Sequence, residues 1–528
     1  MAAGRATNAA EPGAAQDAGH AVEHVALTLA DQLPMLLILV PLVAAPLIVL
    51  LGSRRLAWPL AYGAATASFV MAVFLLMRVI GGEVISYHIG GWAPPLGIEY
   101  RVDSANAFVL FLVTGIATVV LPYARTSVAA EVDGQHGTLF YAMFLLCFTG
   151  LLGVVITGDA FNVFVFLEIS SLSTYVLIAA GAVRDRRALT AAYDYLIMGT
   201  IGATFFVIGL GLLYMATGTL NMADIAERIA DQTGNRTVRA AFAFIVVGVG
   251  LKAAIYPLHL WLPNAYTYAP SAVTAFLAAT ATKVAIYVLM RFMFSVFQPL
   301  YLVEVKTLEF IIIPLALLAM FAASVIAIFQ TDLKRLLAYS SLAQIGYMLL
   351  GIGFLSETGL TAAIAHLFNH GITKAALFMG VGALVLRFGN SYCDGVAGAG
   401  RTMPWTSAAM VIGGLSLIGV PGTAGFISKW VLVQGALEAG WWPVAMLIVL
   451  SSLLAVVYVW RMIETLYLQP APERAAAGEA PLSMLVPMWL MALACIWFGL
   501  NTELTLGASL SAAKGFMAGS PGLILAGH

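Results

Sequence analysis

The chain has 528 residues, of which 61% are hydrophobic and only 10% are charged, and its mean hydropathy is +0.95. A soluble domain normally carries about 25% charged residues, so this composition excludes an ordinary soluble enzyme, a disordered chain, a collagen and a coiled coil. The net charge of −1 gives no reason to expect a nucleic-acid partner. Three widely separated cysteines, Cys147, Cys393 and Cys495, argue against a metal site, an iron–sulfur cluster or a disulfide framework. The composition therefore predicts a polytopic membrane protein.

Apolar runs of membrane-spanning length follow a polar beginning. Residues 1–34 are rich in Ala and Gly and lack the basic stretch of a secretory signal, so we expect a flexible polar tail. The run from Phe310 to Phe329 is uncharged throughout and, at about 1.5 Å per residue, is long enough to cross a ~30 Å hydrocarbon core. Fourteen transmembrane helices are predicted near residues 35–51, 57–80, 104–122, 138–156, 160–182, 190–217, 240–262, 270–294, 308–330, 333–355, 360–387, 405–436, 442–467 and 482–500.

Two connections have patterns of their own. Residues 82–102 alternate apolar and polar side chains around a Gly/Pro turn, which predicts a small β-hairpin at the membrane surface. Residues 221–238 have the pattern of a short amphipathic surface helix.

The distribution of basic residues predicts the orientation. Lys and Arg are more frequent in connections after odd-numbered helices than in those after even-numbered ones. We call the side of the membrane that carries the odd connections the cationic face. Its basic residues are Arg54, Arg55, Arg125, Arg184, Arg186, Arg187, Lys334, Arg335, Arg387, Arg401, Arg461 and Arg474. The positive-inside rule predicts that this face is cytoplasmic and that both termini lie on the outer side.

Four lysines, Lys252, Lys283, Lys374 and Lys429, fall inside apolar runs, together with one clear acid, Glu168. Each unsatisfied lysine at the bilayer centre would cost about 2.5–3.5 kcal/mol. Four of them would cost on the order of 10 kcal/mol, comparable to the whole stability of a typical protein. These groups must therefore be paired, hydrated or neutral. A chain of such groups is suited to relaying protons, whereas the ordinary alternative is that the lysines snorkel to an interface or form one structural ion pair.

Helix eleven supports the relay interpretation. His366, His370 and Lys374 are spaced at i, i+4 and i+8, so they share one face of that helix. The alternative is that the histidines only bridge helices by hydrogen bonds. A metal site on the two histidines is disfavoured because no suitable third ligand is adjacent.

Other ionisable residues have weaker claims to the relay. His259 lies near the presumed break in helix seven. Asp159 precedes helix five, where capping the helix is its first expected role and the relay its second. Asp332, Lys334 and Arg335 begin helix ten at the cationic face, where we expect them to anchor the helix at the membrane surface.

Helix-breaking residues accompany two of the lysines. Pro257 and Pro263 follow Lys252, and Pro421 with two glycines precedes Lys429. Proline removes a backbone donor and clashes with the preceding turn, so helices seven and twelve should be broken at depth. Broken helices in corresponding positions of two halves indicate inverted repeats, here helices four to eight and nine to thirteen. The alternative is a pair of proline kinks used for packing.

The predicted organisation has five parts. They are the tail 1–34, helices one to three with the hairpin in 35–130, a first five-helix repeat in 131–300, a second in 301–470, and helix fourteen with a C-terminal tail in 471–528.

The motifs around these residues resemble those of the antiporter-like subunits shared by Mrp-type Na+/H+ antiporters, respiratory complex I and membrane-bound hydrogenases. The stretches that carry the resemblance are TGDAFNVFVFLEISSLSTY, GLKAAIYPLHLWLPNAY, ATKVAIYVLMR, TDLKRLLAYSSLAQIGYM, HLFNHGITKAALFM and GFISKW. They follow the family order through helices four to twelve. The resemblance implies a helical membrane subunit. Because the sequence contains no flavin, iron–sulfur or nucleotide motif, we expect no cofactor, and we expect no bound metal.

The resemblance also implies roles for individual residues. Glu168 matches the essential helix-five glutamate, which is thought to control the lysine matched by Lys252. Lys283 matches the central helix-eight lysine, His366 a helix-eleven histidine, and Lys429 the ionisable group on broken helix twelve. Weaker matches are His259 and Lys374.

Within the family, the segments GGWAPPLGIEY and TGDAFNVFVFLE most resemble the D-type member of Mrp antiporters. Lys429 stands where one complex I branch carries glutamate, and we expect no long lateral helix beyond helix fourteen. The resemblance implies a proton-translocating subunit of a multisubunit Na+/H+ antiporter in a bacterial inner membrane, with hydrophobic subunits, protons and Na+ as partners. One alternative is a subunit of a redox-driven complex I or hydrogenase. A further alternative is a structural scaffold with vestigial lysines.

The predicted orientation can be tested with a topology reporter fused after His528. We expect activity characteristic of the outer side of the membrane, because an even number of crossings returns the chain to the side of its N-terminus. Cytoplasmic reporter activity would contradict the topology.

Overall fold

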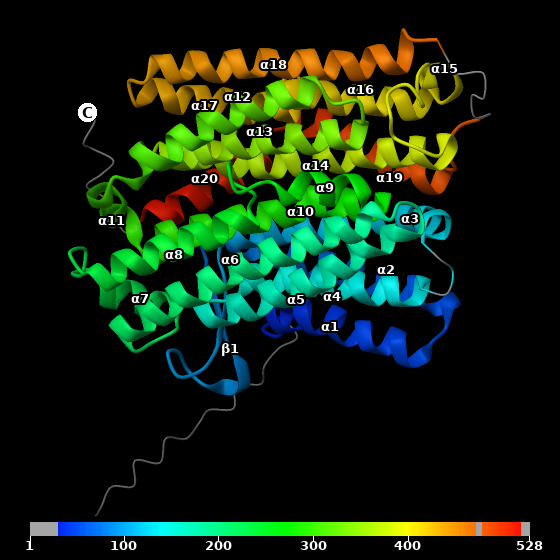
Figure 1. Cartoon of the computed structure of the whole chain (residues 1–528). Helices are drawn as coiled ribbons and strands as arrows, with labels where there is room; N and C mark the ends of the chain where they lie inside the picture. Colours follow the sequence, from blue (N-terminus) through cyan, green and yellow to red (C-terminus); the bar gives the residue numbers. More distant parts are fainter. Residues whose placement is uncertain (1–29, 133, 135, 471–477, 519–528) are drawn as a thin grey trace, which may run out of the picture.

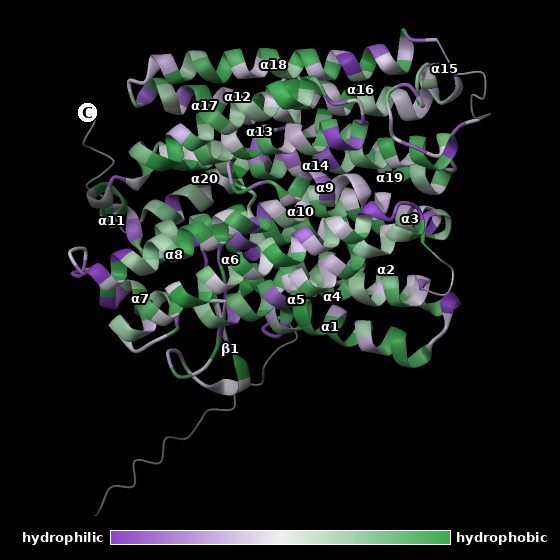
Figure 2. Ribbon diagram, viewed as in Figure 1, coloured by the Kyte–Doolittle hydropathy of each residue, from purple (hydrophilic) through white to green (hydrophobic). Residues whose placement is uncertain are grey.

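The computed structural model describes residues 30–132, 134, 136–470 and 478–518. Long helices run side by side across the molecule, with a small hairpin at the lower edge of the view (Figure 1). Hydrophobic residues dominate the helices along the outside of the bundle, and hydrophilic residues gather at its ends and in parts of its interior (Figure 2). The fold is thus all-α and polytopic, as predicted.

The chain begins with three long helices and the hairpin. The elements are α1 (Leu33–Leu51), α2 (Arg54–Val79), β1 (Ile85–His88), β2 (Glu99–Val102) and α3 (Ser104–Glu131). The two strands are antiparallel, with Ile85 opposite Val102 and His88 opposite Glu99. The predicted hairpin is confirmed.

The next segment contains the first broken helix. Its elements are α4 (Gly137–Ile156), α5 (Ala160–Ala179), α6 (Arg187–Thr217), α7 (Met222–Ile229), α8 (Arg236–Lys252), α9 (Trp261–Tyr268) and α10 (Ser271–Met290). The short helix α7 buries Ile225 and Ile229 and leaves its charged side chains toward solvent, which confirms the predicted amphipathic helix.

The last segment contains the second broken helix. Its elements are α11 (Gln298–Val305), α12 (Ile313–Ile328), α13 (Leu333–Gly353), α14 (Glu357–Phe388), α15 (Ala399–Thr402), α16 (Pro404–Ile418), α17 (Ala424–Glu438), α18 (Trp442–Tyr467), α19 (Leu482–Leu500) and α20 (Glu503–Met517). In the part of the chain that the structure describes, 12 helices are long and apolar enough to cross a membrane. The pairs α8/α9 and α16/α17 stand at the predicted helices seven and twelve.

Helix α20 corrects the prediction that the residues after helix fourteen form a tail. It packs against α3 and α14, with the Ser511 hydroxyl 2.9 Å from that of Ser104 and Lys514 Nζ 3.9 Å from Glu357 Oε1. Its buried face consists largely of small residues such as Ala508 and Ala512. Such a face does not give the long, strongly apolar run by which the other helices were recognised.

The first and last described helices have their outer ends on one face of the bundle. Before α1, Gln32 accepts a hydrogen bond of 2.8 Å from the Tyr87 hydroxyl of the hairpin. Near the end of α20, Phe516 packs under the Arg291 guanidinium, which also binds Asp103 just after the hairpin. The two ends therefore share a face of the bundle, and the number of crossings stays a prediction.

Helices α10, α13 and α14 form the centre of the bundle. In the most apolar stretch of each, 94%, 94% and 83% of residues are buried, compared with 33% for α1 and α18 at the edges. Helix α14 approaches α10 closely because residue 371 is glycine. A Cβ atom there would lie 3.1 Å from the Ala279 carbonyl oxygen. This contact lies one turn from Lys283 and from Lys374, so the predicted relay residues on these helices belong to the core.

Candidate functional site

The first helix break releases carbonyl groups beside a lysine. Helix α8 ends at Lys252 and the chain becomes helical again only at Trp261. The Trp261 indole donates to the Leu251 carbonyl at 2.9 Å, and the Ile255 amide donates to Gly250 at 2.9 Å. The last carbonyls of a helix carry partial negative charge. The Lys252 ammonium therefore sits at the electrostatically favourable end of α8.

Lys252 faces α5 across a short polar contact. Its Nζ lies 3.9 Å from Glu168 Oε1 and donates a hydrogen bond to the Ser171 hydroxyl. The Lys252 side chain is 10% exposed and that of Glu168 is 28% exposed. Within the described structure Glu168 Oε1 has no hydrogen-bond partner. The pair is thus a loose charge contact, with the serine as the closer partner of the ammonium group.

The second break holds Lys429 directly. Its Nζ donates to the carbonyls of Leu417 and Ile418 at 3.0 and 2.9 Å, and these are the last residues of α16. The same Nζ lies 4.7 Å from the centre of the Tyr347 ring. Two charge-assisted hydrogen bonds contribute about 3–6 kcal/mol. That is enough to offset the roughly 2.5–3.5 kcal/mol cost of placing a lysine in the membrane core.

Lys374 and Lys283 are fully buried and are held by neutral groups. Lys374 Nζ donates to the Leu337 carbonyl at 2.8 Å and to the Ser340 hydroxyl at 2.6 Å. Lys283 Nζ donates to the Ala278 carbonyl at 2.5 Å and contacts the Thr282 hydroxyl at 3.4 Å. Among the described residues, neither amine forms an ion pair with a carboxylate.

The two histidines of α14 lie one turn apart, and His366 contacts both α13 and α17. His366 Nδ1 lies 2.9 Å from the Ser428 hydroxyl, and Nε2 lies 2.9 Å from Gln344 Oε1. Because an amide oxygen only accepts, this pairing assigns the proton to Nε2 and makes Nδ1 the acceptor from Ser428. The His370 ring stacks on that of His366 at 6.0 Å, and its two nitrogens have no hydrogen-bond partner among the described residues.

These groups form a row across the bundle. Helix α5 carries Glu168, α8 Lys252, α10 Lys283, α14 the two histidines with Lys374, and α17 Lys429. Helix α8 packs on α10, α10 on α14, and α14 on α17, while Lys252 reaches α5. The helices that carry the row therefore pack one against the next through the bundle. Their arrangement can be followed in Figure 1.

Two of the weaker candidates have other surroundings, and Asp159 lies well away from Glu168 on its helix. Asp159 caps α5, accepting a 2.7 Å hydrogen bond from the Asn162 amide, about 13 Å along the helix from Glu168. Burial raises the pKa of the Asp159 carboxyl, although amide donors at the cap oppose that shift. His259 stacks on Tyr256 at 4.7 Å inside the first break. Asp159 has the capping role that the sequence predicted first.

The prediction that Lys334 anchors α13 at the membrane surface is wrong, because its side chain is buried. Arg335 is partly exposed, and its anchoring role stays a prediction. Lys334 is only 4% exposed, and its Nζ donates to the Ala269 carbonyl at 3.1 Å. Arg335 donates to Asn264 Oδ1 at 3.1 Å. Asp332 caps α13 and accepts a 2.7 Å hydrogen bond from Ser391. All three residues form contacts within the protein, which helix-end composition alone does not indicate.

The hydroxyl partners of the lysines were also missed, although the sequence contains a signal for them. The stretches LEISSL (167–172) and LAYSSL (337–342) share a serine pair. In both, the two hydroxyls donate to the carbonyl of the leading leucine, Leu167 or Leu337, and one of them contacts a lysine. A search for internal similarity would have paired these motifs.

The fold and site define a polytopic membrane protein with a buried row of ionisable side chains supported by two broken helices. A family model described as NADH:quinone oxidoreductase/Mrp antiporter, TM, matches residues 157–455. That is more than half of the chain, so the chain belongs to this family.

Individual relatives come from both branches of the family name. The N-type subunit of NADH-quinone oxidoreductase from Desulforudis audaxviator is 40% identical over 89% of this chain and 96% of its own. The D-type Na(+)/H(+) antiporter subunit of Alkalihalophilus pseudofirmus is 30% identical over 77% of this chain and 81% of its own. A chain in the structure of the Mrp complex from Dietzia sp. DQ12-45-1b superposes with a TM-score of 0.85 at 25% identity, covering 93% of this chain and 98% of that one.

Proposed function

We propose that the chain is the D-type, proton-translocating subunit of a multisubunit cation/proton antiporter. The observation that carries the proposal is the row of buried amines and imidazoles. The amines and His366 bind mainly uncharged groups, and the His370 nitrogens have no hydrogen-bond partner among the described residues. The similarity to a D-type antiporter subunit and to a chain of an Mrp complex supports the antiporter assignment.

In this mechanism Lys252 is the switch. When its amine is protonated, attraction to Glu168 at 3.9 Å is worth about 4 kcal/mol at an effective dielectric constant of about 20. When the amine is neutral, that attraction disappears. Ser171 can then turn its hydroxyl hydrogen from the Leu167 carbonyl to the nitrogen lone pair, because a hydroxyl can both accept and donate. The position of the Lys252 side chain thus follows its protonation.

The middle of the row passes the proton onward. A proton leaving Lys283 reaches the unpaired nitrogens of His370, then His366, which already contacts Ser428 beside Lys429. Protonating His366 at Nδ1 requires only that the Ser428 hydroxyl turn from donor to acceptor. Lys429 receives the proton against the last carbonyls of α16 and releases it at the second break. Lys374 adds a further amine to the same face of α14.

We also infer that residues 131–300 and 301–470 are two inverted repeats. Asp159 and Asp332 cap α5 and α13, and each pairs as an isolated antiparallel bridge, with Asn221 and Tyr392 respectively. The shared serine motifs and the two helix breaks support the same division. Each repeat thus contributes a broken helix and a serine motif to the proposed pathway.

A partner subunit is part of the proposal. Glu168 is 28% exposed although it lies in a membrane-spanning helix, and a carboxylate left against lipid is costly. A neighbouring hydrophobic subunit on the α5 side would cover it. The relatives named as subunits, and the Mrp complex itself, support such an assembly.

A second candidate function is proton pumping in a redox-driven assembly, favoured by the 40% identity to an NADH-quinone oxidoreductase subunit. The same row would carry the protons, and other subunits would carry the electrons. Purifying the native assembly separates the two: hydrophobic partners alone favour the antiporter, whereas cysteine-rich cluster proteins favour the pump. A scaffold with vestigial lysines is the remaining alternative.

Replacing either partner of the switch should abolish transport. In everted vesicles that contain the native assembly, we expect Glu168→Ala or Lys252→Ala to eliminate the dissipation of a pH gradient on addition of Na+. Lys514→Ala is the control, because this lysine is exposed on the surface of α20. Wild-type dissipation in either switch variant, with normal assembly, would refute the mechanism.

The serine pair of α5 offers a matched comparison. Ser171 and Ser170 both donate to the Leu167 carbonyl, but only Ser171 also contacts Lys252. Losing a hydrogen bond to a charged group costs about 1.5–3 kcal/mol, so Ser171→Ala should slow transport roughly tenfold or more. Ser170→Ala should stay near the wild-type rate. Equal effects in the same vesicle assay would show that the contact with Lys252 is irrelevant.

A further inference from the structure

A second group of charged residues lies outside the row, around a cavity of about 220 Å³. The cavity lies where α3 and α14 end and where α6, α10 and α13 begin, which is the cationic face of the bundle. Its lining includes Glu131, Arg184 and Lys334. The mechanism proposed above uses none of them.

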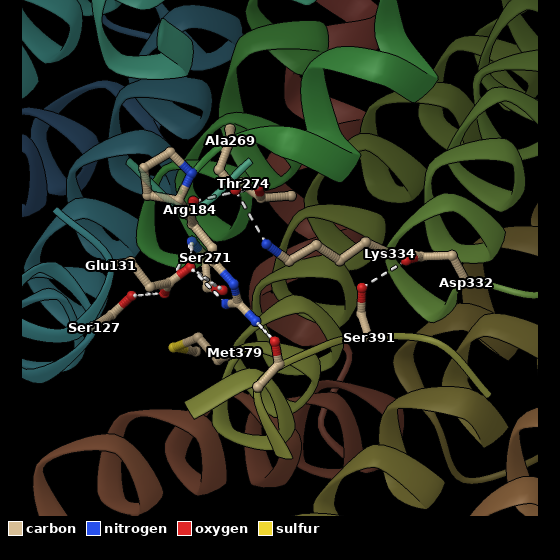
Figure 3. Close-up of polar contacts among 12 residues, drawn as sticks. Ser127, Glu131, Arg184, Ala269, Ser271, Thr274, Asp332, Lys334, Met379 and Ser391 are labelled. Atoms are coloured by element: carbon tan, nitrogen blue, oxygen red, sulfur yellow. Dashed lines mark hydrogen bonds and ion pairs between the residues drawn. The ribbon is translucent and has the colours of Figure 1, made fainter. Parts of the chain in front are cut away.

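The backbone turn at residues 269–271 binds both the Lys334 and the Glu131 side chains. The Ala269 carbonyl accepts from Lys334 Nζ at 3.1 Å. Two residues later, the Ser271 amide donates to both Glu131 oxygens at 3.2 and 3.1 Å, and its hydroxyl donates to Glu131 Oε2 at 3.1 Å. Figure 3 shows Lys334 reaching this turn from one side, with Glu131 and Arg184 on the other. The turn links α9, which follows the first break, to α10, which carries Lys283.

The carboxylate end of the group is tied to the protein surface. Arg184 Nη1 lies 3.5 Å from Glu131 Oε2, and the same guanidinium donates to the Gly389 carbonyl. The Arg184 side chain is 32% exposed, whereas that of Glu131 is 8% exposed. Solvent therefore reaches the arginine, and the group becomes progressively more buried toward Lys334.

Lys334 leads into the row along α13. Lys334, Leu337 and Ser340 are spaced at i, i+3 and i+6, so they follow one winding stripe of that helix. The Leu337 carbonyl and the Ser340 hydroxyl are the two groups that hold Lys374. About one turn of helix, roughly 5 Å along its axis, separates the residue in the cavity from the carbonyl that binds the buried amine.

We propose that Lys334 is a proton-exchange residue, through which Lys374 exchanges protons with water in the cavity on the cationic face. In the inward step, a water-derived proton binds the Lys334 amine, and the ammonium group then gives one proton to the Lys374 amine. The outward step is the reverse, so no charge is created or lost overall. Glu131 holds the Ala269–Ser271 turn in place and attracts protons to the cavity. This inference rests on the proposed function.

Other ionisable groups face this cavity, and each contributes to its pH dependence. Helix α6 and the loop before it contribute Arg184, Asp185 and Arg187. The other groups are Glu131 of α3, Tyr268 of α9, Asp332 of α13 and Tyr392 of the segment after α14. Lys334, at 4% exposed, is the most buried of these charged groups, and it lies one helical turn before Leu337.

Lys334→Arg is the deciding variant. Arginine keeps the positive charge and can donate to the Ala269 carbonyl, but it does not release its proton in proteins. We expect the assembly to form normally and the proton flux in everted vesicles to fall roughly tenfold or more near neutral pH, the size of effect typical of a lost acid–base group. The flux should recover partly as the pH on the cationic face is lowered. Lys514→Arg, on the opposite face, should leave flux unchanged at every pH.

A structural anchor predicts the opposite result. If Lys334→Arg transports like the wild type across the pH range, Lys334 only holds the Ala269 turn, and the inference is overturned. If Lys334→Arg does not assemble, Glu131→Gln decides. It keeps an acceptor for Ser271 and removes the charge, so its half-maximal flux should shift to lower pH, and an unshifted profile overturns the inference. Failure of the proposed function itself would appear separately, as wild-type transport in Glu168→Ala.

Discussion

An ammonium group in an apolar core must find acceptors, and in this chain the acceptors are mostly uncharged. Lys283, Lys374 and Lys429 are held by backbone carbonyls and hydroxyls, and Lys252 binds a serine more closely than its carboxylate. The use of uncharged acceptors has a consequence for function. Removing the charge of one member of a buried ion pair leaves an unpaired charge, at a cost of about 3–5 kcal/mol. Removing a proton from an amine held by a carbonyl leaves no such charge.

The second helix break supplies such acceptors to Lys429, where a continuous helix would hide them. The ends of α8 and α16 present carbonyls in the core, and Lys252 and Lys429 lie at those ends. Arginine is used differently. Arg291 makes a close ion pair with Asp103, with atoms 2.7 Å apart, and Arg184 pairs with Glu131. Because arginine keeps its proton, such pairs are static, which suits the ends of the bundle rather than its interior.

Features determined by local composition could be predicted from the sequence. The spanning runs, the hairpin, α7 and the position of the two breaks follow from hydropathy, alternation and proline, and the structure contains each of them. The buried lysines could be predicted because charge inside an apolar run is rare. Their partners could not, since Ser340 and Leu337 meet Lys374 only through the packing of α13 on α14. The burial of Lys334 was missed for the same reason, because helix-end composition does not show that another helix covers it. Helix α20 was not predicted, because its small residues pack well without forming a long apolar run.

Proton movement along the row of lysines is the central claim, and transport by the native assembly with Lys252, Lys283 and Lys429 all replaced by methionine tests it most directly. Methionine preserves much of the length of each side chain and removes the titrating group. We predict that the variant chain assembles with its partners and that proton flux in vesicles falls to the level of vesicles without the complex. Flux at the wild-type rate would contradict the relay and would make these lysines structural.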